Sequence, residues 1–157
     1  MTDGRSIEET FAAVPLLARL DPRQRDRLAR RATTRSYRPG ATIVRQGDTA
    51  MALYVVLSGL VRIERDSRTG EPVSIRQVGA AGFFGEMGLI DDLPRAATVV
   101  AIEPTQCALL AKWDFQTELR EDPEIALALL PVLTGRIREL EARSAGREPQ
   151  MAAGARP

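Results

Sequence analysis

The residue types with the clearest chemical capacity lie close together, in the segment FFGEMGLIDDLPRAAT over residues 83–98. Glycine at position 85 permits a tight turn and lets a ligand approach the backbone. One or two helical turns over residues 87–91 would present free N–H groups beside Gly85, and such groups bind anions. Arg95 follows the proline that ends these turns, and its planar guanidinium suits a phosphate. The segment therefore predicts a site that holds one phosphate from two sides.

Glu86 places a carboxylate beside the expected anion. A carboxylate repels a phosphate unless it has a hydrogen-bond donor of its own, and a ribose hydroxyl is such a donor. Donors for a phosphate next to an acceptor for a sugar hydroxyl indicate a nucleotide monophosphate. One arginine and a few backbone amides match the single charge of a cyclic phosphodiester, whereas a triphosphate usually also requires lysine and Mg²⁺.

The amino-acid composition removes most catalytic alternatives. The 157 residues contain no histidine, which excludes Ser-His-Asp and Cys-His catalysis and histidine-zinc sites. Cys107 is the single cysteine, so internal disulfides, paired-cysteine redox motifs and thiolate zinc clusters are excluded as well. We assign no catalytic residue, metal ligand or cofactor, and we expect a protein without enzymatic activity. A lone thiol also suits a reducing compartment, which favours a cytoplasmic location.

Charge and hydropathy do not point to a membrane or a nucleic acid as partner. The net charge is +1, so the overall field attracts neither strongly. No run approaches the roughly 18 uncharged apolar residues that a membrane-spanning helix needs. Arginines are frequent between residues 19 and 38, but Tyr37 is the one aromatic residue among them, and we do not expect nucleic-acid binding there.

Hydrophobic periodicity divides the chain into helix, strands and helix, and predicts a single domain over residues 1–145. Residues 6–35 are predicted to form helices, residues 36–113 a β-barrel or jelly roll, and residues 114–145 helices again. The middle part is assigned to β-structure because short alternating strands are separated by turn residues at close intervals. The fold class is therefore mainly β with flanking helices, and a short helix interrupts the strands within the phosphate-binding segment.

Helix-capping residues, prolines and alternating side chains predict where individual helices and strands begin and end. Asp21 followed by Pro22 predicts the start of a helix, and Val73, Ile75 and Gln77 alternate as in a short strand. Asp122-Pro123-Glu124 opens another helix in the same way, and Pro131 should kink or divide that helix. Residues 146–157 are small, polar or glycine- and proline-containing, and are predicted to be a disordered tail.

At the residues described first, the chain resembles the cyclic nucleotide-binding domain family. The stretch FGEMGLIDDLPRAATV is similar to the phosphate-binding cassette of that family, and Gly-Glu followed at this spacing by Pro-Arg-Ala-Ala-Thr is a specific pattern. The resemblance extends over about residues 12–140. Within the family, the chain is most similar to the cytosolic domain of bacterial cyclic nucleotide-gated channels, because residues 114–116 and 123–125 also match that branch at the same spacing.

The resemblance implies a role for each residue of the cassette. Arg95 would pair with the cyclic phosphate, Glu86 would accept the ribose 2′-hydroxyl, and nearby backbone amides would complete the cage. Alanine at position 96 stands where family members that prefer cGMP often carry threonine, which favours cAMP here. In the channel branch an arginine on the last helix touches the base. Counting without gaps from Arg95 through residues 114–116 and 123–125 places that arginine at Arg136. The predicted ligand-binding residues are Gly85, Glu86, Met87, Arg95, Ala96 and Arg136. Gly88 occupies a position that many members fill with alanine, and this glycine is not expected to spoil the site.

The function that follows is a non-catalytic regulatory domain that binds cAMP first and cGMP second, and that transmits binding through its C-terminal helices. Its further partner is an unidentified effector domain or protein, with an ion channel as one candidate. Two alternatives stay open. The chain could be the ligand-binding part of a catabolite activator-type regulator without its DNA-binding domain, or the pocket could serve another small anion.

Overall fold

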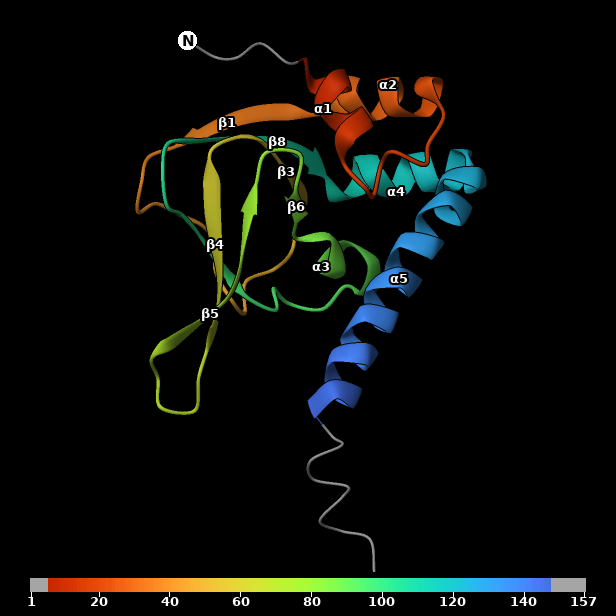
Figure 1. Ribbon diagram of the computed structural model, residues 1–157. Helices are drawn as coiled ribbons and strands as arrows, with labels where there is room; N and C mark the ends of the chain where they lie inside the picture. Colours follow the sequence, from red (N-terminus) through yellow and green to blue (C-terminus); the bar gives the residue numbers. More distant parts are fainter. Residues whose placement is uncertain (1–5, 148–157) are drawn as a thin grey trace, which may run out of the picture.

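The computed structural model describes residues 6–147 and contains two four-stranded antiparallel sheets with helices against them (Figure 1). The predicted fold class, mainly β with flanking helices, is confirmed. The strands are β1 (Thr33–Tyr37), β2 (Thr42–Val44), β3 (Ala52–Ser58), β4 (Leu60–Asp66), β5 (Pro72–Gly79), β6 (Phe83–Phe84), β7 (Thr98–Ala101) and β8 (Thr105–Ala111). Their order is β1-β8-β3-β6 in one sheet and β2-β7-β4-β5 in the other. The strands begin at Thr33, earlier than the predicted boundary at residue 36.

The N-terminal helices are α1 (Ile7–Ala13) and α2 (Pro22–Arg31). The start of α2 has the predicted cap: an Asp21 side-chain oxygen accepts from the Gln24 backbone N–H at 2.8 Å, and the Gln24 side chain accepts from the Asp21 N–H at 3.0 Å. This reciprocal pair satisfies two backbone donors, and Pro22 occupies the first turn, where its missing N–H costs nothing. The local sequence therefore fixes where α2 begins.

Burial divides the apolar side chains into two clusters. One contains Val56, Val61 and Cys107, each fully buried on strands of the two facing sheets. The other packs side chains of the helices, such as Leu28 and Ile125, against the opposite face of the β1-β8-β3-β6 sheet. Burial raises the pKa of the Cys107 thiol to about 12, so this cysteine is a core residue and not a reactive thiol.

The C-terminal helices are α4 (Lys112–Glu121) and α5 (Pro123–Arg147). In Figure 1, α1, α2 and α4 lie together at one end of the barrel, and α5 leaves that group and runs along the side where the segment after β6 lies. Apart from the N-terminal and C-terminal residues that the structure does not describe, no helix is both long and apolar enough to cross a bilayer.

Pro131 does not divide the last helix, so that part of the prediction is wrong. The proline lies inside one helix that continues from Pro123 to Arg147. Pro131 is exposed, and so is Leu127, whose carbonyl loses its helical partner at this point. Water can satisfy that carbonyl, which is why the helix continues past the proline. The helix also includes positions 146 and 147 of the predicted tail, and the remainder of that tail lies outside the described residues.

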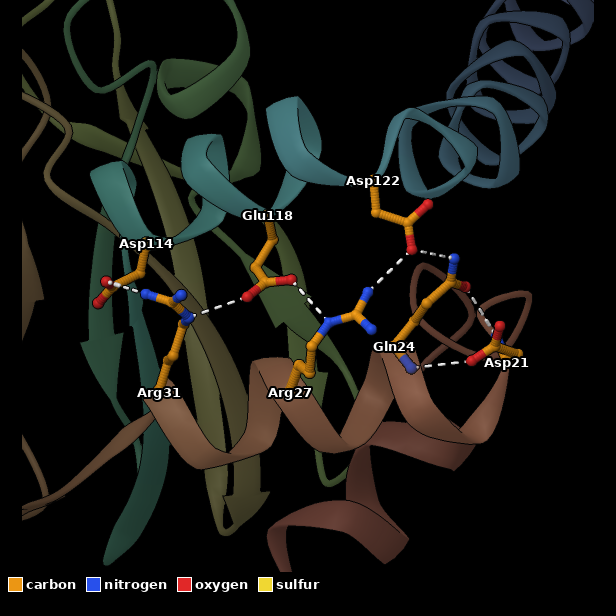
Figure 2. A network of polar contacts seen from close by, with 7 residues as sticks. All are labelled: Asp21, Gln24, Arg27, Arg31, Asp114, Glu118 and Asp122. Atoms are coloured by element: carbon orange, nitrogen blue, oxygen red, sulfur yellow. Dashed lines mark hydrogen bonds and ion pairs between the residues drawn. The ribbon is translucent and has the colours of Figure 1, made fainter.

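A polar network joins α2 to α4 (Figure 2). Glu118 on α4 is its centre, because its side chain is only 3% exposed and accepts from Arg27 and Arg31, with N–O distances of 3.0 Å to each. Arg31 also pairs with Asp114, at 3.0 Å. A buried carboxylate with two cationic partners fixes the two helices relative to each other, since withdrawal of either helix would leave its charge unpaired.

The same network reaches the junction between α4 and α5. Asp122, the residue between these helices, accepts from Arg27 at 2.8 Å and from Gln24 at 2.9 Å. The hydrogen bond from Gln24 and then that from Arg27 lower the pKa of the Asp122 carboxyl below its usual value. Asp122 therefore stays charged at neutral pH, and the starting point of α5 is anchored to α2 (Figure 2).

Candidate functional site

The phosphate-binding segment turns between β6 and the short helix α3 (Glu86–Asp91), which begins within one residue of the predicted turns. Gly85 joins the two elements with a φ of +87°, a conformation that glycine adopts readily and most residues avoid. A Cβ at this position would overlap Nη1 of Arg95 and lie 3.2 Å from the Ala52 carbonyl oxygen. Both the backbone conformation and the approach of Arg95 therefore require glycine at position 85.

Arg95 is held by the backbone on one side of its guanidinium. It is 7% exposed, and it donates to the carbonyl oxygens of Gly85 at 3.0 Å and Ala52 at 2.8 Å. Within residues 6–147 it has no ion-pair partner. Burial lowers the pKa of Arg95, and nearby groups including Glu86 oppose that shift. A buried cation without a counter-charge is costly, and a bound anion would offset that cost.

Glu86 opens α3 and is 6% exposed. Its carboxylate oxygen Oε1 forms an ion pair with Arg136, which comes from α5, fifty positions later in the chain. The Arg136 guanidinium also lies over the Phe83 ring, 4.3 Å from its centroid. The last helix is thus attached to the phosphate-binding segment by one arginine, through a charge pair and a cation–π contact.

A cavity of about 170 Å³ brings the predicted residues together. Its lining includes Gly85, Glu86, Met87, Arg95 and Ala96, all from the predicted set. Arg136 does not line this cavity but reaches its edge through Glu86. Arg95 and Glu86 thus line one cavity, while a contact between Arg136 and a base stays a prediction.

The cavity also has walls that sequence reasoning did not assign. Apolar side chains of the β2-β7-β4-β5 sheet line it, among them Ile63, Ile75 and Val99, and two further arginines, Arg65 and Arg76, stand beside them. Arg65 donates to the Ala96 carbonyl at 3.3 Å. Arg76 shares a face of β5 with the buried Val78, two positions later, but Arg76 is itself exposed, so the alternation along this strand gave no signal for it.

Gly88 has a packing role that its place in a helix does not suggest. A Cβ at position 88 would overlap the Cβ of Ala50 and lie 3.0 Å from the Leu93 carbonyl oxygen. We expect Gly88→Ala to destabilise the fold by up to about 2 kcal/mol, because a gain in helix propensity of about 1 kcal/mol only partly offsets an overpacking cost of about 1–3 kcal/mol. Denaturant unfolding measures this change.

Gly135→Ala provides the matched control for that substitution. Gly135 lies in α5, and its added Cβ would meet no atom within 4 Å beyond its own helix backbone and chain neighbours. This variant should therefore gain about 1 kcal/mol from helix propensity alone. If both variants were stabilised equally, the close approach of Gly88 to Ala50 would be wrong.

Comparison with known proteins agrees with this geometry. The family model "Cyclic nucleotide-binding domain" matches residues 34–122, more than half of the chain. The chain is 35% identical over 127 residues to the cyclic AMP receptor protein of Thermus thermophilus, covering 81% of this chain and 59% of that protein. It is 38% identical over 113 residues to the cAMP-dependent protein kinase regulatory subunit of Colletotrichum orbiculare, covering 71% of this chain and 28% of the subunit.

A solved structure shares the fold as well. The catabolite activator protein of Thermus thermophilus superposes with a TM-score of 0.76 at 34% identity, over 83% of this chain and 62% of that chain. The chain therefore belongs to the cyclic nucleotide-binding domain family. It spans 59% of the length of the cyclic AMP receptor protein and 28% of the length of the kinase regulatory subunit. Channel proteins are not among these relatives, and the likeness to the channel branch stays a prediction.

Proposed function

We propose that this domain binds a cyclic nucleotide in the cavity beside α3 and converts binding into a movement of α5. The observation that carries the proposal is Arg95, a buried guanidinium without an acidic partner among the described residues, on the wall of a cavity that also contains a carboxylate. A phosphodiester would supply the missing counter-charge. Relatives named as a cyclic AMP receptor and as a subunit of a cAMP-dependent kinase support a cyclic nucleotide as the source of that charge.

The phosphate would lie between Arg95 and the backbone that starts α3. Two of the Arg95 nitrogens already donate to the carbonyls of Gly85 and Ala52, which orients the guanidinium plane. The remaining N–H groups of its five are available to phosphate oxygens. An arginine held in place by backbone carbonyls loses little conformational freedom when it binds an anion, which favours affinity.

The ribose would lie on Glu86. Arg136 contacts Oε1 of this carboxylate, which leaves Oε2 to accept a hydroxyl. In the proposed bound state Arg136 turns from Glu86 toward the base, and α5 moves with it. Because α5 starts from a junction anchored by Asp122, its movement would be a change of angle at that end. The effector that would read this movement is a further domain or protein.

Among cyclic nucleotides, cAMP is the proposed first ligand and cGMP the second. Ala96 lines the cavity without a hydroxyl group that could meet a guanine amino group. The named relatives are described by cAMP, which supports the same order. No group among the described residues is assigned a catalytic role, and the ligand would be released unchanged.

Titration calorimetry with cAMP, cGMP and AMP tests the proposal. We expect binding of cAMP and cGMP, with cAMP tighter, and much weaker binding of AMP, because its dianionic open phosphate does not match a cage for one charge. A melting temperature that rises with cAMP concentration would provide independent support. If the melting temperature does not change with either cyclic nucleotide in excess, the proposal is wrong. If AMP binds as tightly as cAMP, the site is a general anion pocket.

A further inference from the structure

Arg95 lies in a stretch of chain that no helix or strand holds in place. Residues 92–97 connect the end of α3 to the start of β7 and belong to neither element. The backbone of Arg95 is nevertheless fixed twice: its N–H donates to the Asp48 carbonyl at 2.8 Å, and its carbonyl accepts from the Gly47 N–H at 2.9 Å. The position of Arg95 is therefore set by the turn at residues 46–48, which comes much earlier in the chain.

The turn at residues 46–48 is itself held from two directions through Gln46. Because β7 lies between β2 and β4 in its sheet, the turn after β2 reaches both the start of β7 and the end of β4. The Gln46 N–H donates to Oγ1 of Thr98, the first residue of β7, at 2.9 Å. The Gln46 side-chain oxygen accepts from the N–H of Asp66, the last residue of β4, at 2.9 Å. These hydrogen bonds fix the turn to the sheet on both sides of β7.

Thr98 is the last residue of the phosphate-binding segment, and neither the phosphate nor the sugar is assigned to it. It is half-buried and is not among the residues that line the cavity, so its hydroxyl can act on a ligand only through other residues. Gly47 and Asp48 are exposed, so water competes for the groups that hold Arg95. A turn tied down at Gln46 keeps these groups in place, which a strand residue without an acceptor could not do.

We propose that Thr98 is a positioning residue for the phosphate site: its hydroxyl holds the turn at residues 46–48, and that turn holds Arg95. This inference rests on the proposed function. The next carbonyl along the chain, that of Ala96, is held as well, because it accepts from Arg65 at 3.3 Å. Donors that are fixed before a ligand arrives lose less conformational freedom on binding, so the hydroxyl of Thr98 raises the affinity for the phosphate without touching it.

Titration calorimetry with cAMP and cGMP tests this role. Thr98→Val keeps the branched shape but removes the acceptor, and we expect it to weaken both nucleotides equally, by about tenfold, the size of one hydrogen bond. The losses should be equal because the phosphate is common to both nucleotides. Thr98→Ser keeps the hydroxyl and should restore most of the wild-type affinity. Thr34→Val makes the same substitution at an exposed position of β1 and should change neither affinity.

Hydrogen exchange without ligand follows the turn directly. The amide hydrogens of Gly47 and Arg95 are protected by the hydrogen bonds between the turn and Arg95, so their exchange, followed by NMR, should be faster in Thr98→Val than in the wild type. Melting curves confirm that each variant is folded. Should Thr98→Val not fold, Gln46→Ala removes the acceptor of the Asp66 N–H instead and should change affinity and exchange in the same direction.

The possible results separate the inference from the proposed function. Unchanged affinities in a folded Thr98→Val protein would show that Thr98 is only a strand residue. A loss for one nucleotide alone would place its effect at the base, and an equal loss in Thr98→Ser would mean that the hydroxyl is not responsible. Each of these results overturns the positioning role while nucleotide binding stands. If the wild-type protein binds neither nucleotide, the proposed function fails and the inference fails with it.

Discussion

Replacement of Arg95 by alanine is expected to weaken cAMP binding by about 2–5 kcal/mol, the range found when one partner of a buried charge pair is removed. The physical reason is that the proposed cavity offers the phosphate one fully oriented cation. Arg95 is 7% exposed and its guanidinium plane is set by two carbonyl contacts, so alanine would leave a bound phosphate without this oriented partner. Calorimetric titration at neutral pH measures the change.

Two further variants make this result specific. Arg95→Lys keeps the charge but cannot donate to both the Gly85 and Ala52 carbonyls with the same geometry, and we expect an intermediate loss. Arg68→Ala changes the net charge by the same amount at an exposed turn and should leave the affinity unchanged. Unaltered cAMP affinity in a folded Arg95→Ala protein would remove Arg95 from the site.

Replacement of Glu118 by alanine is expected to lower the free energy of unfolding by about 3 kcal/mol. The carboxylate is buried and accepts from both Arg27 and Arg31, so its loss leaves two arginines of α2 without their shared partner. These arginines are 44% and 37% exposed and can partly turn to water, which places the expected value at the lower end for a broken buried pair. Urea unfolding followed by circular dichroism measures the loss.

Glu121→Ala is the matched control for the network. It removes the same charge from the same helix at an exposed position and should change the stability by less than about 0.5 kcal/mol. A Glu118→Ala loss no larger than that of Glu121→Ala would show that α2 and α4 are held together by apolar packing alone, and that the contacts in Figure 2 contribute nothing measurable.

Local sequence rules predicted much of the fold because the interactions that decide it span only a few residues. The Asp21 cap depends on a neighbour three positions away, and the turn at position 85 follows from the positive φ that glycine adopts readily. Alternation between apolar and polar residues predicted the strands of the middle part, because this pattern too spans only a few residues. The sequence left open whether Pro131 kinks or divides its helix, because the effect of a proline depends on whether the freed carbonyl faces solvent, which the sequence does not state.

The residues of segment 83–98 by themselves indicated the class of this protein, through their capacity to hold a phosphate and a sugar hydroxyl and through the resemblance of their pattern to a known phosphate-binding cassette. Only the tertiary structure decided which distant side chains complete the cavity. Arg136 meets Glu86 across fifty positions, Gly88 packs against Ala50, and Ile75 and Arg76 of β5 both line the cavity. These contacts depend on strand register and on the path of a long helix, which are set by packing over the whole domain.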